Sequence, residues 1–266
     1  MKRLILSLAA VMTAFAVHLS AQEGAVYKAS LFGCISDGIT LNTNSIQTAV
    51  NTIHEKGGGS LHFYVGRYLT GTIHLKSNVT IVLHEGATLV GAPSIYDYDS
   101  PGNGAPRGLI IAGGQHSIGV IGDLPETPSI PPAQKPEIKG MGIIQGWGAK
   151  LLKVMNDQQQ KGYLEQGTAP ALISFVDCDN VRVEGLMLLE AAGDVQSYRN
   201  CRNVSVINQL VESKDTPASN GVTFGNCDGI SLTGNFFEVT GKPIRTEGRI
   251  KGLKTSQNKT KSGTVR

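Results

Sequence analysis

Short runs of aliphatic and β-branched residues, broken by glycine and asparagine, fill most of the chain after residue 59. Runs of this kind between turn-forming residues are typical of β-strands. We therefore predict strands over residues 61–65, 71–75, 79–83, 118–121, 142–144, 173–176, 181–183, 204–207, 222–224 and 230–232. Strands this short and this closely spaced indicate an all-β sandwich, barrel or solenoid.

One amphipathic helix is predicted ahead of these strands, over about residues 43–56. Ile46, Ala49, Val50 and Ile53 recur at the spacing that places side chains on one face of a helix. Asparagine and threonine at positions 42 and 43 can cap its start, and three consecutive glycines at 57–59 end it.

A repeat late in the chain distinguishes between the three all-β folds. Cys178, Cys201 and Cys227 stand in similar segments, 23 and 26 residues apart. In a parallel β-helix, equivalent residues of successive coils stack about 4.8 Å apart. We therefore predict a right-handed parallel β-helix from about residue 60 to 245, with these thiols buried on one sheet and the helix covering its N-terminal end. Asn180 and Asn203 should stack at the adjoining turn and share side-chain hydrogen bonds.

The start of the chain predicts a signal peptide over residues 1–21. Lys2 and Arg3 precede an apolar run at 4–17, and small residues lead to a cleavage point after Ala21. The apolar run is shorter than the roughly 20 residues that cross a bilayer. We therefore expect a secreted or periplasmic protein with no membrane segment after cleavage, and a single domain over residues 22–266.

Composition removes several function classes. Aromatic residues make up 6% of the chain and the net charge is +3, whereas a nucleic-acid binder would show a basic face with interleaved aromatics. The four cysteines lack the paired short spacings of a metal site, so we expect no metal and no cofactor. Basic residues gather near the end, where we expect a solvated tail over about residues 248–266.

Several segments resemble glycoside hydrolase family 28, the polygalacturonases and their relatives in the pectin lyase-like superfamily. They are residues 32–38 (Phe-Gly-Cys-Ile-Ser-Asp-Gly), 44–49, 57–59, 68–80, 85–89 and 142–148. The resemblance runs from about residue 30 to 245. It implies the parallel β-helix fold and a pectic, uronate-rich polysaccharide as the partner.

The family's chemistry is inverting hydrolysis, which needs one acid to protonate the leaving oxygen and one carboxylate to activate water. The resemblance places the family's first acid, from its Asn-Thr-Asp-Gly segment, at Asn220. It places the Asp-Asp pair of the next coil at Gly241 and Lys242. All three acids are therefore replaced, and whether the chain is an enzyme stays open at this point.

Other residues are candidates for the work of the site. Asp215 is a weak candidate for a relocated acid, among the carboxylates near the expected cleft, which also include Asp194, Glu212, Glu238 and Glu247. Lys242, Arg245 and Arg249 are candidates for binding uronate carboxylates. The segment Arg249-Ile250-Lys251 resembles the family's Arg-Ile-Lys motif but follows Lys242 too closely for the coils that should intervene, so the last coils are expected to be incomplete.

Two hypotheses remain for the function. The first is an exported, monomeric polygalacturonase-like protein that recognises pectic or other acidic polysaccharide with impaired or absent hydrolysis. The alternative is an active inverting glycoside hydrolase that uses relocated acids. A lyase is a further alternative, for which cations at Lys242, Arg245 and Arg249 would neutralise the uronate, although no acidic cluster for calcium is visible.

Overall fold

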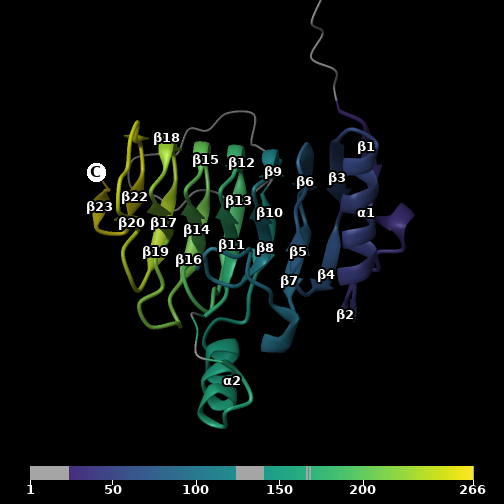
Figure 1. Cartoon of the computed structure of the whole chain (residues 1–266), viewed down its shortest axis with the longest axis horizontal. Coiled ribbons are helices and arrows are strands. Elements are labelled where there is room, and N and C mark those ends of the chain that lie inside the picture. Colours follow the sequence, from purple (N-terminus) through teal and green to yellow (C-terminus); the bar gives the residue numbers. More distant parts are fainter. Residues whose placement is uncertain (1–23, 124–140, 166, 168, 266) are drawn as a thin grey trace, which may run out of the picture.

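The computed structural model describes residues 24–123, 141–165, 167 and 169–265 (Figure 1). The predicted signal peptide lies outside these residues. No helix in the described part of the chain is both long enough and apolar enough to cross a membrane.

The described strands form three sheets, to which successive coils each contribute one strand (Figure 1). The first sheet contains β1 (Val26–Lys28), β3 (Gly59–Phe63), β6 (Val79–Leu83), β9 (His116–Gly122), β12 (Asp179–Glu184), β15 (Arg202–Ile207), β18 (Asp228–Thr233) and β21 (Lys254–Ser256). The second contains β2 (Asp37–Leu41), β4 (Gly66–Thr70), β7 (Ala87–Gly91), β10 (Gly142–Gln145), β13 (Leu186–Leu189), β16 (Leu210–Ser213), β19 (Phe236–Val239), β22 (Lys259–Thr260) and β23 (Gly263–Thr264). The third contains β5 (Ile73–His74), β8 (Gly108–Gly113), β11 (Ala171–Val176), β14 (Gln196–Arg199), β17 (Val222–Gly225) and β20 (Ile244–Glu247).

The predicted right-handed parallel β-helix is confirmed. Neighbouring strands pair in parallel throughout the three sheets, apart from the antiparallel pair β22–β23. Parallel register stacks like on like inside the coils, as Phe175, Tyr198 and Phe224 show on successive strands of the third sheet. The rings of Tyr198 and Phe224 stack with centroids 5.4 Å apart. This column of aromatic side chains fills the interior beneath the third sheet.

The three repeated cysteines are buried in successive coils, but not on a sheet as predicted. They lie at the corner between the third and first sheets, just before β12, β15 and β18. The residue before each one ends the strand of the third sheet by adopting a left-handed conformation: Asp177 (φ 55°), Asn200 (φ 53°) and Asn226 (φ 53°). Hydrogen bonds with the neighbouring thiols, together with burial, raise the pKa of Cys201.

Asn180 and Asn203 occupy equivalent positions at the same corner, both with left-handed backbone. They do not bond to each other as predicted. The Asn203 amide donates to Asp179 Oδ1 at 2.9 Å, and the Asn180 amide donates to Ser117 Oγ at 3.2 Å. Each amide therefore links its own coil to the one before it.

The predicted helix is α1 (Thr43–Glu55), which lies across the N-terminal end of the β-helix with its four apolar residues buried (Figure 1). A second helix, α2 (Gly148–Gln160), was not predicted. It is inserted between β10 and β11 and projects from the lower edge of the sheets in Figure 1. Tyr96, in the short 3-10 helix η2 (Ile95–Asp97), donates its hydroxyl to Gln158 of α2 at 2.9 Å. A further 3-10 helix, η1 (Ala29–Phe32), precedes β2.

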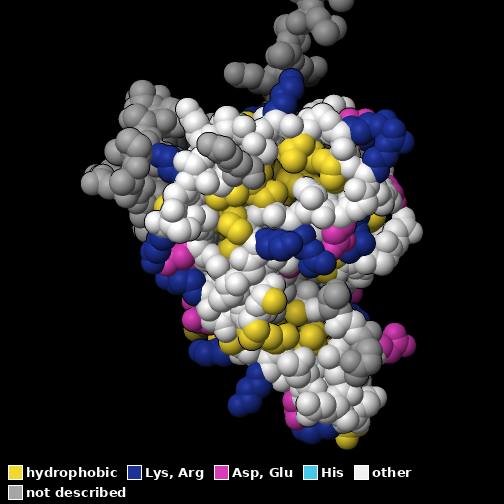
Figure 2. All heavy atoms as spheres, turned by 90° about the vertical axis from the view of Figure 1, so that its left-hand side faces the viewer, with side chains coloured by type: hydrophobic (Ala, Val, Ile, Leu, Met, Phe, Trp, Pro, Cys, Tyr) yellow, Lys and Arg dark blue, Asp and Glu magenta, His cyan; other side chains and the backbone are white. Residues whose placement is uncertain are grey.

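The predicted basic tail is mostly exposed, as expected for a solvated segment, but it continues the β-helix instead of fraying. β21 pairs in parallel with β18, and β22 with β19. Asn258 is fully buried in this last part and donates its amide to the Leu232 carbonyl at 2.8 Å. Figure 2 looks onto this end of the molecule and shows hydrophobic side chains at the surface, interrupted by a band of basic and acidic ones.

Candidate functional site

A groove of about 300 Å³ lies on the outer face of the third sheet, mainly over β14, β17 and β20. The parallel register brings Ser197, Thr223 and Arg245 into one column across these three strands. The groove is lined by Gly104, Pro106, Ala169, Gly193, Asp194, Ser197, Arg199, Ala218, Thr223, Arg245 and Glu247.

Asp194 stands at the edge of the groove, in the loop that leads into β14. Its Oδ1 accepts a hydrogen bond from the Asn220 side-chain amide at 2.7 Å, and its Oδ2 accepts one from the Thr223 hydroxyl at 2.6 Å. The Asn220 side-chain carbonyl in turn accepts from the Lys242 backbone N–H at 2.8 Å. Asp194, Asn220 and Lys242 therefore form one column across three coils.

Gly241 lies against Asn220 with no room for a side chain. A Cβ at this position would stand 2.7 Å from Asn220 Oδ1 and 2.7 Å from the Ser219 carbonyl oxygen. Real Cβ atoms essentially never approach neighbours closer than 3.0 Å. The local backbone therefore excludes a side chain, including a carboxylate, at residue 241.

Two arginines and a glutamate form the other part of the groove. Arg245 Nη2 lies 2.6 Å from Glu247 Oε1, and Arg199 Nη2 lies 3.4 Å from Glu247 Oε2. The Nε atom of Arg199 is buried and has no hydrogen-bond partner in the described structure. Glu247 is thus neutralised from two sides, while Arg199 keeps one unused donor next to the groove.

Several known proteins resemble this chain in sequence and in structure. No family model matches the chain. A solved structure described as a candidate glycosyl hydrolase from Parabacteroides merdae is 38% identical, with a TM-score of 0.78, and the match covers 90% of this chain and 100% of that one. A probable polygalacturonase from Vitis vinifera is 33% identical over 114 residues, covering 40% of this chain and 23% of the relative. An exo-poly-alpha-D-galacturonosidase from Dickeya chrysanthemi is 39% identical over 67 residues, 25% of this chain and 11% of the relative.

The solved family 28 exopolygalacturonase of Yersinia enterocolitica has the same fold, with a TM-score of 0.70 at 20% identity, over 88% of this chain and 49% of that one. The chain belongs to the polygalacturonase-like glycoside hydrolases of family 28. It spans less than a quarter of the length of the two curated relatives above.

The structure separates the residues that the family resemblance singled out. Asn220 and Gly241 lie beside the groove, with Asn220 buried. Arg245 lines the groove, whereas Lys242 and Arg249 are exposed residues outside its lining. The three positions at which the resemblance expects acids therefore lie close together, and they carry an amide, no side chain and a lysine.

The weak candidate Asp215 does not line this groove. It lies in the loop that follows β16, two residues after Ser213, and lines a different pocket. Glu212 and Glu238 lie on the second sheet and contact Lys214 Nζ at 2.7 and 3.2 Å. Of the carboxylates considered near the cleft, Asp194 and Glu247 are the two that line it.

Arg199 lines the groove but was not among the residues predicted from the sequence. A signal for it was present, because Arg199 precedes Cys201 by the same two positions by which Gly225 precedes Cys227. The register confirms this equivalence, with Arg199 beside Gly225 and Gly225 beside Glu247. Counting coils back from position 247 would have placed Arg199 and Glu247 in one column.

The groove can bind anions and hydroxyl groups, but its carboxylates are occupied. Asp194 accepts hydrogen bonds from Asn220 and Thr223, and Glu247 is held by two guanidinium groups. An inverting hydrolase needs an acid and a base on opposite sides of the sugar.

No group of three or more histidine, cysteine or carboxylate side chains in the described residues can hold a metal ion.

Proposed function

We propose that this chain binds a pectic or other acidic polysaccharide in the groove on the third sheet and does not hydrolyse it. The observation that carries the proposal is the packing at Gly241, where a Cβ would lie 2.7 Å from both Asn220 Oδ1 and the Ser219 carbonyl oxygen. One family acid position has no side chain, and its neighbour in the column, Asn220, cannot exchange a proton. The relatives named as polygalacturonases supply the class of ligand.

The cations of the groove suit a uronate-rich ligand. Arg245 is exposed over 46% of its side chain and Arg199 over 37%, so both guanidinium groups can reach a carboxylate in solution. Lys242, just outside the lining, adds positive charge at the same edge. Each exposed ion pair contributes only about 0.2–1 kcal/mol and is screened by salt. Affinity should therefore be modest and should fall as ionic strength rises.

Export belongs to the same proposal. The charged start, the apolar run and the small residues before position 22 support a signal peptide, and pectic polysaccharides are extracellular polymers. We infer a secreted or periplasmic, monomeric protein of one domain that needs no metal or other cofactor.

Two assays on the same preparation test the proposal. Binding to polygalacturonate should be measurable at low salt, while release of reducing ends from polygalacturonate and rhamnogalacturonan should stay at background. The double variant Lys242→Gln/Arg245→Gln removes two charges and should weaken binding. Lys56→Gln/Lys153→Gln removes two exposed charges, one just after α1 and one on α2, and should bind like the parent. If the groove variant binds as well as the parent, the groove is not the binding site.

The alternative, hydrolysis by relocated acids, has one observation in its favour. Asp194 lies in the same column as the family acid position and lines the groove. If the protein releases reducing ends at rates usual for enzymes, of order 1–10³ per second, then Asp194→Asn should abolish that activity. Background activity in the parent chain would exclude this alternative.

A further inference from the structure

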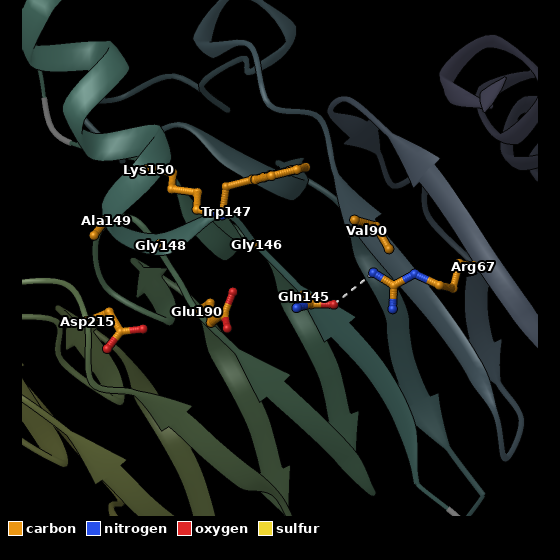
Figure 3. A pocket seen from close by; sticks show the side chains of 10 residues that line it. All are labelled: Arg67, Val90, Gln145, Gly146, Trp147, Gly148, Ala149, Lys150, Glu190 and Asp215. Atoms are coloured by element: carbon orange, nitrogen blue, oxygen red, sulfur yellow. Dashed lines mark hydrogen bonds between the residues drawn. The ribbon is translucent and has the colours of Figure 1, made fainter. Parts of the chain in front are cut away.

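A second hollow, of about 560 Å³, lies across the second sheet, on the other side of the loops that border the groove. We call it the trough. It is lined by Arg67, Val90, Gln145, Gly146, Trp147, Gly148, Ala149, Lys150, Glu190 and Asp215 (Figure 3). These residues come from five successive coils, which places its two ends roughly 19 Å apart along the axis of the β-helix.

Two carboxylates stand at one end of the trough. Figure 3 shows Glu190 and Asp215 on neighbouring coils, beside Gln145 and the start of α2. Both are exposed, and in the described structure neither side chain has a hydrogen-bond or ion-pair partner. Most other carboxylates of the second and third sheets are paired, as Glu238 and Glu247 are. Two free acceptors therefore face the same hollow.

The rest of the trough carries donors and an aromatic ring. Arg67 donates from Nη2 to Gln145 Oε1 at 3.1 Å, the contact marked by a dashed line in Figure 3. The indole N–H of Trp147 donates to the Gly91 carbonyl, and Lys150 Nζ lies 5.7 Å from the centre of the indole ring. Arg67 thus lies at the end opposite the carboxylates, while Lys150 and the indole ring of Trp147 lie along the side of the trough, next to the start of α2 (Figure 3).

The floor of the trough is rigid. The Gly148 N–H donates to the Glu190 carbonyl at 2.7 Å, and the Gly146 N–H donates to the Leu189 carbonyl at 2.9 Å. A Cβ at residue 146 would stand 2.4 Å from the Glu190 carbonyl oxygen, so only glycine permits this contact. The turn at 146–148 and the backbone of Glu190 are therefore held together before any ligand arrives.

We propose that the trough is a second glycan-binding site, which takes a stretch of oligosaccharide along the axis of the β-helix. Sugar hydroxyls donate to Glu190 and Asp215, and an acidic group of the glycan meets Arg67. The polar groups converge on an elongated hollow beside an aromatic ring, as small-molecule sites do. The class of glycan rests on the proposed function, but the trough and the groove share no lining residue.

The two sites are nevertheless joined by common loops. The loop before β14 places Glu190 in the trough and Asp194 in the groove, and the loop before β17 places Asp215 in the trough and Ala218 in the groove. A glycan chain that crosses this ridge can occupy both sites at once. Linking two weak sites in this way raises the overall affinity well above that of either one.

Titration calorimetry on the full chain tests the proposal. The probes are an oligogalacturonate of about six units and the same oligomer with its carboxylates reduced to alcohols. Glu190→Gln/Asp215→Asn removes the trough carboxylates without changing their shape, and Lys242→Gln/Arg245→Gln alters the groove alone. Glu55→Gln, on an exposed carboxylate of α1, is the matched control. We expect the trough variant to lose at least about tenfold in affinity for both probes, and Arg67→Gln to weaken the charged probe alone.

Each outcome decides between the sites. If only the groove variant loses binding, the trough proposal is wrong and the groove function stands. If only the trough variant loses binding, the trough stands and the groove function is wrong. If calcium alone binds the parent and this binding is lost in the trough variant, the carboxylates form a cation site and the glycan proposal is overturned. If neither probe binds the parent, both proposals fall.

Discussion

The side-chain amide of Asn220 donates to the Asp194 carboxylate at 2.7 Å, while its carbonyl oxygen accepts from the Lys242 backbone N–H at 2.8 Å. One amide therefore connects three coils, because it offers a donor on one side and an acceptor on the other. An ionised carboxylate at residue 220 can only accept. Asn220 is thus a structural link that an ionised carboxylate at the same position could not form.

Asn220→Asp should destabilise the protein rather than restore hydrolysis. The new carboxylate would lie against Asp194 in a largely buried site. The hydrogen bond that the Asn220 amide donates to the Asp194 carboxylate would be lost, which lowers the free energy of unfolding by about 1–3 kcal/mol. Like charges in contact raise the pKa of one of the two carboxyls. The loss of stability relative to the parent should be full at pH 7 and shrink as the pH falls through this raised pKa, since a proton restores the missing donor. Urea unfolding at pH 7 and at pH 4 measures both effects.

Asn220→Ser, which keeps a small neutral side chain, is the control for the charge. Its loss of stability should not depend on pH over this range. Equal pH dependence in both variants would show that the contact between residues 194 and 220 does not form. Release of reducing ends by Asn220→Asp would show that the groove already holds the second carboxyl group that hydrolysis needs.

Gly241→Ala should destabilise the protein by about 1–3 kcal/mol, as overpacking of a tight site usually does. The physical reason is the 2.7 Å approach of a Cβ to Asn220 Oδ1 and to the Ser219 carbonyl oxygen. Gly167→Ala is a matched control, because a Cβ there meets nothing within 4 Å. Thermal or urea unfolding of the two variants gives the comparison. Equal stability of both would mean that the backbone at residue 241 can move aside, and that an acid could have been kept there.

The thiols should be unreactive in the folded protein. All four cysteines are buried and unpaired, and burial raises the pKa of Cys34 to about 11. Thiolate is the reactive form. Hydrogen bonds with Cys201 lower the pKa of Cys178 and Cys227, so for these two thiols it is burial at the corner that keeps the reagent out. Ellman's reagent should titrate close to no thiol in the native state and four per chain in 6–8 M urea, a count that the sequence supplies. Fewer than four in urea would reveal a disulfide and contradict the stacked, reduced thiols at the corner.

Stability should fall on mild acidification because of His62, on β3. Its Nδ1 lies 2.8 Å from His84 Nε2, and His84 contacts Asp123 at 3.0 Å. Burial, and then the neighbouring His84, lower the pKa of His62, against the opposite effect of Asp123. The unfolded chain therefore binds the proton first, so stability is full above the ordinary histidine pKa of about 6.5 and declines as the pH falls below it.

Urea midpoints between pH 5 and 8 measure this decline, and His62→Gln should make it shallower. Lys28 from β1 and the Tyr64 ring also face this cluster, with Lys28 Nζ 5.8 Å from the ring centre. Lys28→Gln serves as the control for their contribution. An unchanged slope in His62→Gln would assign the decline to other groups.

The fold could be predicted from the sequence because equivalent corner positions of successive coils take similar residues, which therefore recur at intervals of one coil length. Cys178, Cys201 and Cys227 fill one small buried corner, and their repeat distinguished the parallel β-helix from a sandwich or a barrel. Their exact place was wrong, since the left-handed residues that precede them end the third sheet one position earlier. Helix α2 was missed because Leu151 and Met155 are its only well-buried large side chains, which leaves too weak an apolar face to recognise.

The site was predicted less well because it depends on the register between coils. Arg245 was predicted as a cation near the expected cleft, but Arg199 and Glu247 meet only when β14, β17 and β20 are set side by side. Asp215 and Asn220 are five residues apart in one loop, yet Asp215 is exposed in the trough while Asn220 is buried against Asp194. Asp215 was predicted as a site residue because it is close to Asn220 in the chain. The two side chains point in different directions because the backbone turns between them.

β20 carries Arg245 and Glu247 at the outermost position of the third sheet, where it has a neighbouring strand on one side alone. In a solenoid each coil is stabilised by its immediate neighbours, so amide hydrogens of this strand should exchange with solvent earlier than those of β14. One wall of the groove is therefore an edge strand, held by fewer backbone hydrogen bonds than the wall formed by β14. A glycan that bridges β14 and β20 would hold this edge strand in place. Slower deuterium uptake at residues 244–247 would therefore report its binding independently of calorimetry.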